Sequence, residues 1–322
     1  LFRSDRGAPG FLAAALALVL AGVLVRRSAS RTAIDRTLVP VLGGVGLALQ
    51  LAQLNASPPG MVVRIDPWFS TVFTIGLALL GLAGAVLVAG TGARHSRAAL
   101  AVAVAAHVTM GVLVIRHAQG TFIDVDVFQR EAAAALRHGV NPYAMTFPNI
   151  YGNDGYYGPG MSVGGRLQFG FPYFPLSLLA AMPGELLAGD HRYAALVAMD
   201  LAAILMVSAR RLGFGPLAAV LYLTSPRGFF VLEQSWTEPF VVLGLAAVVW
   251  AASRHPRVLP WLFGAFVALK QYLVFALPAA WLLVPAPRGT RAFLRWMARA
   301  ALAGAVITVP FILWNPAAFI TS

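Results

Sequence analysis

The chain has no cysteine, a single lysine and few charged residues of any kind. Without cysteine among its 322 residues, disulfides and thiolate metal sites are excluded. Charged residues make up 11% of the chain, whereas a soluble domain typically has about 25%. Lys270 is the only lysine among 24 basic residues. So low a charge content excludes an ordinary soluble domain.

Several catalytic and metal-binding patterns are also missing. The six histidines are scattered without an H-x-x-x-H pair, so we expect no metal site. No phosphate-binding glycine-rich loop is present, and we expect no cofactor. The segment "GMSVG" (160–164) matches G-x-S-x-G, but a nucleophile elbow needs a strand before it and a helix after it. Here the segment lies in a loop rich in Gly and Tyr.

Apolar residues dominate what is present. They make up 59% of the chain, and the mean hydropathy is +0.76. A helix needs about 20 apolar residues to cross a membrane. Runs of nearly that length or more lie at 7–25, 37–63, 65–93 (broken only by Asp66) and 98–115. We therefore predict an all-α polytopic transmembrane bundle of about ten apolar helices, with residues 1–322 forming one domain. A start at Leu1 and an end soon after the run at 300–314 are compatible with a piece of a longer protein.

The net charge of +12 follows the pattern of membrane topology rather than that of nucleic-acid binding. The arginines gather in short segments between apolar runs, as the positive-inside rule describes for cytoplasmic loops. We assign five segments to the cytoplasm: 26–36, 94–97, 210–211, 254–257 and 288–299. The protein is thus predicted to lie in the cell membrane, to contact membrane lipids and to bind no nucleic acid.

The segments between these arginines alternate to the outer face. Residues 116–172 form a large extracytoplasmic loop with a juxtamembrane helix, since they are too rich in Gly, Pro, Asn and Tyr for one span. Smaller outer segments are 55–69 and 225–239. Between Arg257 and Arg288, a hairpin of two short helices places Lys270 at an outer turn. The runs at 173–188 and 193–209 look like two membrane crossings. The outer loop before them and the cytoplasmic arginines after them require an odd number of crossings, however. Either one of the two runs is re-entrant, or Arg210 and Arg211 lie outside.

Acidic residues begin the outer loop in "TFIDVDVFQREAAAALRHGVNPYA" (121–144). We predict a helix from Val127 to His138, because "AAAAL" favours helix, Gly139 suits the position after the C-cap and Pro142 prevents continuation. Asp126 suits a helix cap, with Gln129 in the capping-box position. Asp124 lacks that structural explanation, and a carboxylate at the membrane surface is able to act as a general base.

Three further sites carry polar residues in apolar surroundings. Lys270 either snorkels to water or binds an anion such as a lipid phosphate. The segment "RGFFVLEQSWTEP" (227–239) supplies either interfacial aromatic residues or the carboxylates, amide and rings typical of a sugar site. Asp200 lies within "ALVAMDLAAILMV" and either bonds to a neighbouring helix or marks a functional site. Of these two, the interhelical bond is the favoured interpretation.

Residues 100–315 contain three segments in order: "IDVDVFQREAAAALRHGVNPY", "FPYFPLSLL" (171–179) and "ALKQYLVFALP". Through these segments the chain resembles a C-type (GT-C) glycosyltransferase, and in particular bacterial polyprenyl-phosphate-mannose-dependent mannosyltransferases. In such families an Asp of this loop activates the acceptor hydroxyl, and an aromatic residue, more commonly Tyr, follows it four residues later. In this chain the aromatic residue is Phe128, so the resemblance places the Asp at Asp124. The adjacent Asp126 is the alternative.

The resemblance implies an inverting transfer of a sugar of the mannose or arabinose class. The donor would be a polyprenyl-phosphate sugar, and the acceptor a hydroxyl of a cell-envelope lipid or polysaccharide at the extracytoplasmic face. Asp124 or Asp126 would be catalytic, while Lys270 and Arg227 would bind the donor phosphate. The expected substrate-binding residues are Tyr143, Glu233, Gln234, Trp236, Glu238, Gln271 and Tyr272. The alternatives are a transporter or flippase for a lipid-linked sugar, with Asp200 and Lys270 on its path, and a membrane scaffold.

Overall fold

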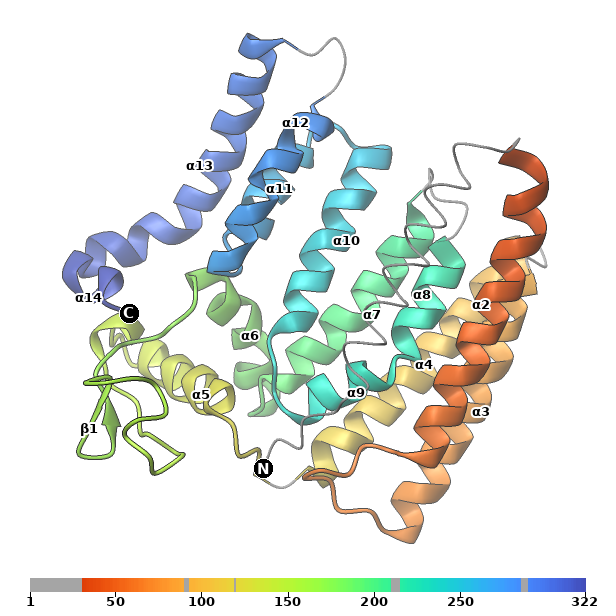
Figure 1. Cartoon of the computed structure of the whole chain (residues 1–322), viewed down its shortest axis with the longest axis horizontal. Helices are drawn as coiled ribbons and strands as arrows, with labels where there is room; N and C mark the ends of the chain where they lie inside the picture. The colour runs from red at the N-terminus through yellow and green to blue at the C-terminus, as the bar shows by residue number, and fades with distance from the viewer. Residues whose placement is uncertain (1–30, 90–92, 119, 210–214, 285–288) are drawn as a thin grey trace.

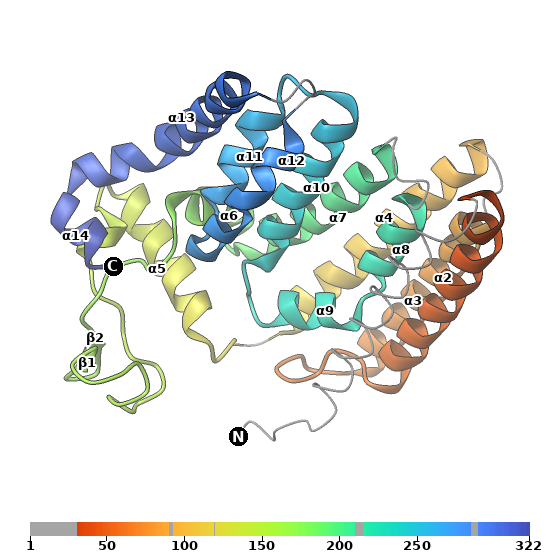
Figure 2. The same ribbon diagram turned by 45° about the horizontal axis from the view of Figure 1, so that its top comes forward.

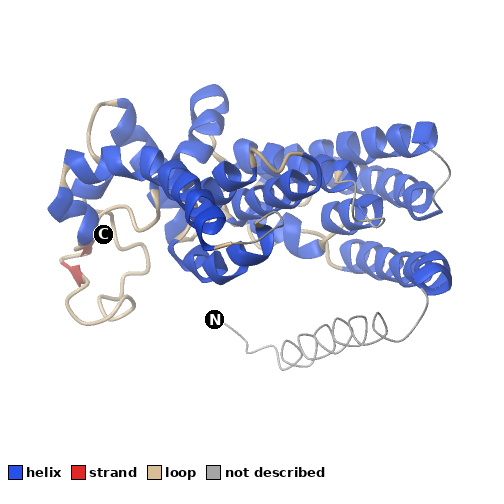
Figure 3. Ribbon diagram, turned by 90° about the horizontal axis from the view of Figure 1, so that it is seen from above, coloured by secondary structure: helices blue, strands red, loops and turns tan. Residues whose placement is uncertain are grey.

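A computed structural model describes residues 31–89, 93–118, 120–209, 215–284 and 289–322 (Figure 1). The predicted mostly helical architecture is confirmed, and one small hairpin, β1–β2, is its only sheet in these ranges (Figure 3). The elements in chain order are α2 (Arg31–Ala56), α3 (Pro67–Ala89), α4 (Ala93–His117), α5 (Asp124–Arg137), η1 (Pro142–Ala144), β1 (Ser162–Val163), β2 (Arg166–Leu167), α6 (Pro175–Ala188), α7 (Arg192–Ser208), α8 (Gly215–Leu223), α9 (Pro226–Glu233), α10 (Glu238–Arg254), α11 (Leu259–Val267), η2 (Gln271–Ala279), α12 (Ala280–Leu283), α13 (Thr290–Trp314) and α14 (Pro316–Ile320).

One apolar core joins α2, α3, α4, α8 and α9, which lie together in Figure 2. The ring of Phe73 packs edge-on against that of Phe229, with centroids 5.7 Å apart. The start of α3 is fixed by Asp66, whose carboxylate accepts a hydrogen bond of 2.7 Å from the amide of Phe69. Pro67 then occupies the first helical position, where its missing N–H costs nothing.

A second core joins α6, α7, α10, α11, η2 and α13. Helix α11 packs closely against α13 because Gly264 faces Ala300, and a methyl group on Gly264 would overlap the carbonyl oxygen of Ala300. Ala268 and Gly304 continue the contact one turn further along each helix. Small residues at this spacing let two helix backbones approach each other in a membrane.

The predicted outer loop forms a third core together with residues of α6, α13 and α14. It packs α5, η1 and the β1–β2 hairpin around the rings of Phe128, Phe147, Tyr143 and Phe171. Helix α5 begins three residues earlier than predicted, at Asp124, and ends at Arg137. Gly139 follows the C-cap with φ of 70°, as its position predicted.

The prediction of about ten membrane-crossing helices is wrong for the described residues. Four helices are long and apolar enough to cross, and a fifth span results if α6 and α7, bent by 116°, count as one. These spans make the chain a multi-pass membrane protein. In the described part of the run at 257–288, α11 has nine residues, and η2 and α12 together form the short helix Gln271–Leu283. A helix of nine residues is about 14 Å long, well below the thickness of about 30 Å of the hydrocarbon core of a membrane. The predicted run at 7–25 lies outside the described residues.

Lys270 lies at the turn of the predicted hairpin. Helix α11 ends at Val267, and the 3-10 helix η2 begins at Gln271 and leads into α12. Figure 1 shows α12 back beside α11 at the upper end of the bundle. The bend between α6 and α7 is compatible with the re-entrant alternative for 173–209, whereas Arg210 and Arg211 lie outside the described residues.

Candidate functional site

Asp124 is the first residue of α5 and is half-buried. Its Oδ2 accepts a hydrogen bond of 2.8 Å from the hydroxyl of Tyr157. Its Oδ1 accepts one of 2.8 Å from the amide of Val125. The positive end of the helix dipole favours a carboxylate at this position. Asp124 is thus held in place by its own helix and by the loop that follows it.

Tyr151 and Tyr157 of that loop hydrogen-bond to Asp124, and Tyr156 packs against both of them. The rings of Tyr151 and Tyr156 lie 4.2 Å apart, and those of Tyr156 and Tyr157 lie 5.1 Å apart. Burial raises the pKa of Tyr151 to about 12. Burial, and then the hydrogen bond to Asp124, raise the pKa of Tyr157 as well. A tyrosine is already protonated at neutral pH, with an ordinary pKa of about 10, and the raised pKa favours the protonated form further, so Tyr157 donates to the carboxylate.

Asp126 does not cap the helix, and that prediction was wrong. The N-cap is Ile123, which offers no side-chain hydrogen bond, because the helix begins before Asp126 rather than after it. Asp126 instead pairs with Arg130, at 3.3 Å, one turn along the same helix. Gln129, the predicted capping-box partner, is fully buried, and its amide has no partner among the described residues.

Lys270 is buried and paired. Its Nζ lies 2.6 Å from Oε1 of Glu238, the first residue of α10. The same ammonium lies 5.0 Å from the ring centroid of Tyr173 and 5.9 Å from that of Tyr272. Two aromatic faces and one carboxylate therefore stabilise the charge, in the way that a desolvated cation requires. Lys270 is not a residue that snorkels to open water.

Tyr173 connects the Asp124 region with the Lys270 region. Burial raises the pKa of Tyr173, and the negative charges of Asp124 and Glu238 raise it further. Gln271, next to Lys270, donates a hydrogen bond of 2.6 Å to the carbonyl of Pro172. The two regions thus form one cluster around Tyr173. We call it the Tyr173 cluster, consisting of Asp124, Tyr151, Tyr157, Tyr173, Glu238, Lys270 and Tyr272.

The turn between α9 and α10 borders this cluster and has unpaired polar groups. Glu233 is buried, and its Oε1 accepts hydrogen bonds of 2.6 and 3.1 Å from the amides of Val62 and Val63. This makes Glu233 an anchor for the loop between α2 and α3. Four buried side-chain atoms of the same turn have no hydrogen-bond partner among the described residues: Gln234 Nε2, Ser235 Oγ, Trp236 Nε1 and Thr237 Oγ1. Buried groups of this kind normally have partners, and a bound polar molecule would supply them.

Two other predicted residues have clear structural contacts. Tyr143 is buried among aromatic rings, and its hydroxyl donates a hydrogen bond of 2.7 Å to the carbonyl of Tyr173. Arg227 is exposed, and its guanidinium lies 4.4 Å from the ring centroid of Phe230 and 5.6 Å from that of Trp236. Tyr143 supports the backbone of the Tyr173 cluster, whereas Arg227 lies on the outside of α9.

Asp200 makes the predicted interhelical bond. Its Oδ1 lies 3.0 Å from Nδ1 of His107 on α4, and both residues are buried. Among the described residues, no group of three or more His, Asp and Glu side chains is arranged to hold a metal ion.

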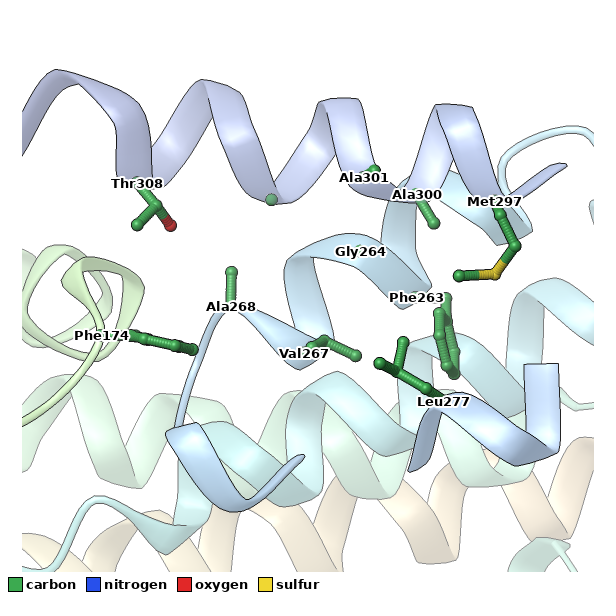
Figure 4. A pocket seen from close by; sticks show the side chains of 11 residues that line it. Phe174, Phe263, Gly264, Val267, Ala268, Leu277, Met297, Ala300, Ala301 and Thr308 are labelled. Atoms are coloured by element: carbon green, nitrogen blue, oxygen red, sulfur yellow. The ribbon is translucent and has the colours of Figure 1, made fainter. Parts of the chain in front are cut away.

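An apolar cavity of about 300 Å³ lies between α11 and α13 (Figure 4). Its lining includes Phe174, which directly follows Tyr173, and Ala268, two residues before Lys270. Figure 4 shows Phe174 and Thr308 at one end and Met297 at the other. The eleven-residue separation of Thr308 and Met297 along α13 corresponds to about 16 Å. The cavity thus extends from the neighbourhood of the Tyr173 cluster along the apolar helices.

Comparisons with protein-family models, with curated proteins and with solved structures give no match.

Three residues of the Tyr173 cluster were not predicted: Tyr151, Tyr157 and Tyr173. Ser235 and Thr237, in the turn that borders the cluster, were not predicted either. The only sequence signal for Tyr151 and Tyr157 is the density of tyrosine in "YGNDGYYG" (151–158).

Proposed function

We propose that the protein is an inverting GT-C glycosyltransferase that moves a sugar of the mannose or arabinose class from a polyprenyl phosphate to an acceptor hydroxyl. The observation that carries the proposal is the Tyr173 cluster, in which the desolvated Lys270 lies over the ring of Tyr173 and the charge of Asp124, held at a helix start, raises the pKa of the same tyrosine. A base and a phosphate-binding cation are the two groups that this reaction requires.

Asp124 would be the base. It takes the proton from the acceptor hydroxyl, and that oxygen forms a bond to the anomeric carbon on the face opposite the phosphate. The bond between the anomeric carbon and the phosphate oxygen breaks, and the phosphate leaves with the electron pair. Tyr157 holds the carboxylate through Oδ2, so it orients Asp124 without removing its charge. Asp126 is the weaker candidate because Arg130 already pairs with it.

Lys270 would bind the donor phosphate. Its present partner, Glu238, has a half-exposed side chain, so a phosphate arriving from outside is able to share or replace that ion pair. A lysine ammonium binds phosphate as a point charge and offsets the negative charge that develops as the phosphate leaves. Gln234, Ser235 and Thr237 would provide hydrogen bonds to sugar hydroxyls.

The apolar cavity would take the first isoprene units of the donor. It begins beside Phe174, which follows Tyr173, and Ala268, two residues before Lys270, so a phosphate at Lys270 would direct its hydrocarbon chain between α11 and α13. The positive-inside distribution of arginine supports an active site at the extracytoplasmic face.

The proposal is tested by incubating the purified protein with radiolabelled polyprenyl-phosphate mannose or arabinose and a panel of cell-envelope acceptors. We expect label to appear in an acceptor with wild-type protein and not with Asp124→Asn, while donor binding persists in both. Transfer by Asp124→Asn at the wild-type rate would contradict the proposal. Movement of lipid-linked sugar across vesicles without transfer would indicate the transporter alternative.

A further inference from the structure

A second cavity, of about 310 Å³, lies at the end of the bundle opposite Lys270. Three arginines line it: Arg257, Arg295 and Arg299. Helix α10 runs from Glu238, beside Lys270, to Arg254 near this cavity, and its 17 residues correspond to about 25 Å. The cavity is therefore separate from the Tyr173 cluster.

The three arginines have no acidic partner in the described part of the chain. None of them forms an ion pair with a carboxylate of the described residues. Residues 239–322 contain no Asp or Glu at all. Arg295 and Arg299 are one turn apart on α13, where like charges repel each other. An anion from outside the chain would relieve this repulsion.

One residue that lines the cavity has a buried donor, and others form an apolar wall. Trp296 lines it and is 5% exposed, and its indole N–H has no hydrogen-bond partner among the described residues. A buried N–H without a partner is destabilising, so a bound acceptor is favoured. Pro260 and Val284 give the same cavity an apolar side. A ligand with both phosphate oxygens and hydrocarbon matches this lining.

We propose that this cavity binds the phosphate of an anionic phospholipid. The arginine guanidinium groups pair with the phosphate oxygens, Trp296 donates a hydrogen bond, and the glycerol and upper acyl carbons contact Pro260 and Val284. The positive-inside rule assigns these arginines to the cytoplasmic leaflet, which carries anionic lipid, and basic pockets between membrane helices bind such headgroups. The site is independent of sugar transfer.

The test is a titration of the purified full chain with short-chain phosphatidylglycerol, with binding measured by native mass spectrometry. We expect Arg295→Gln combined with Arg299→Gln to weaken binding by roughly thirtyfold. The matched control removes two exposed arginines that do not line the cavity, Arg94→Gln with Arg291→Gln, and should change affinity by less than about twofold. Trp296→Phe keeps the charge and should weaken binding by about fivefold.

Several results would overturn the proposal. Equal losses in the cavity variant and the control would mean that the arginines attract anions without a site. Equally tight binding of phosphatidylcholine would exclude recognition of the anionic headgroup. Displacement by inorganic phosphate at the same concentration would mean that no lipid is recognised. If the double variant fails to fold, Arg257→Gln, in the loop after α10, provides the test instead. We expect this variant to bind phosphatidylglycerol about fivefold more weakly, and an unchanged affinity would contradict the proposal.

Discussion

At one end of the bundle the lysine and the carboxylates have partners, whereas at the other end the arginines are exposed and no described carboxylate faces them. Lys270 pairs with Glu238, Glu233 binds two backbone amides, and Asp124 accepts from Tyr157. Arg295 and Arg299, by contrast, have no ion pair among the described residues. A charge removed from water needs a partner within the fold, while an exposed charge is free to bind a ligand from outside. Substitutions at Asp124, Lys270 and Glu233 distinguish a role in chemistry from a role in stability at the first of these two ends.

The largest effect is expected at Asp124. Replacing Asp124 with Asn removes the base but keeps the shape of the side chain, so the transfer rate should fall by roughly a hundredfold to ten-thousandfold. Glu131→Gln, on the same helix, is the matched control and should change the rate by less than about twofold. The measurement is single-turnover transfer from labelled donor. A comparable fall in Asp126→Asn, with Asp124→Asn active, would move the base to Asp126.

The next effect is expected at Lys270. Lys270→Met removes the charge and keeps the length of the side chain, so donor binding should weaken by about tenfold to a hundredfold, since a charge-assisted hydrogen bond contributes about 1.5–3 kcal/mol. Lys270→Arg keeps the charge and should retain much of the affinity. Equilibrium binding of labelled donor measures both. Unchanged affinity in Lys270→Met would exclude Lys270 from phosphate binding.

A smaller effect, on stability rather than on chemistry, is expected at Glu233. In Glu233→Gln the amides of Val62 and Val63 lose an ionised acceptor, so the protein should be destabilised by about 1–2 kcal/mol. Thermal unfolding in detergent measures the change, with Glu131→Gln as control. If Glu233→Gln left the melting temperature unchanged and weakened sugar binding instead, Glu233 would be a substrate residue.

The smallest effect is expected at Ser235. Its φ of 58° is the only positive value among the described non-glycine residues, and the left-handed region costs such a residue about 1–2 kcal/mol. Ser235→Gly should therefore stabilise the fold by about 1 kcal/mol, after the entropy lost by glycine is subtracted. A lower melting temperature in Ser235→Gly would mean that the serine hydroxyl has a partner that outweighs the backbone strain.

Local features of the fold were predictable from the sequence, but the number of spans was not. Gly139 and Pro142 marked the end of α5 because helix termination depends on neighbouring residues. In the apolar run at 212–224, helix α8 ends at Leu223, before the Ser225–Pro226 pair. Apolar composition thus indicated membrane helices, while the length of each helix depended on where the chain turns.

The candidate site was predictable only as a set of residues on one face. Charged residues in an apolar chain are few, so Asp124, Glu238 and Lys270 stood out. Their partners did not, because Tyr157 is 33 residues from Asp124 and Val62 is 171 residues from Glu233. No local pattern encodes such distant contacts. The capping assignment of Asp126 failed for a local reason, since Asp124 was itself able to occupy the first turn of the helix.

The contact of Gly264 with Ala300 determines how α13 joins the bundle in a lipid bilayer. Lipid hydrocarbon is as apolar as the helix surfaces, so exclusion from water does not hold the two helices together. Close packing of small residues does so instead. Such packing requires a matching surface that is already formed. Ribosomal synthesis produces α11 before α13, so the receiving surface precedes the helix that docks on it. We therefore expect α13 to be the last of these helices to associate during membrane insertion.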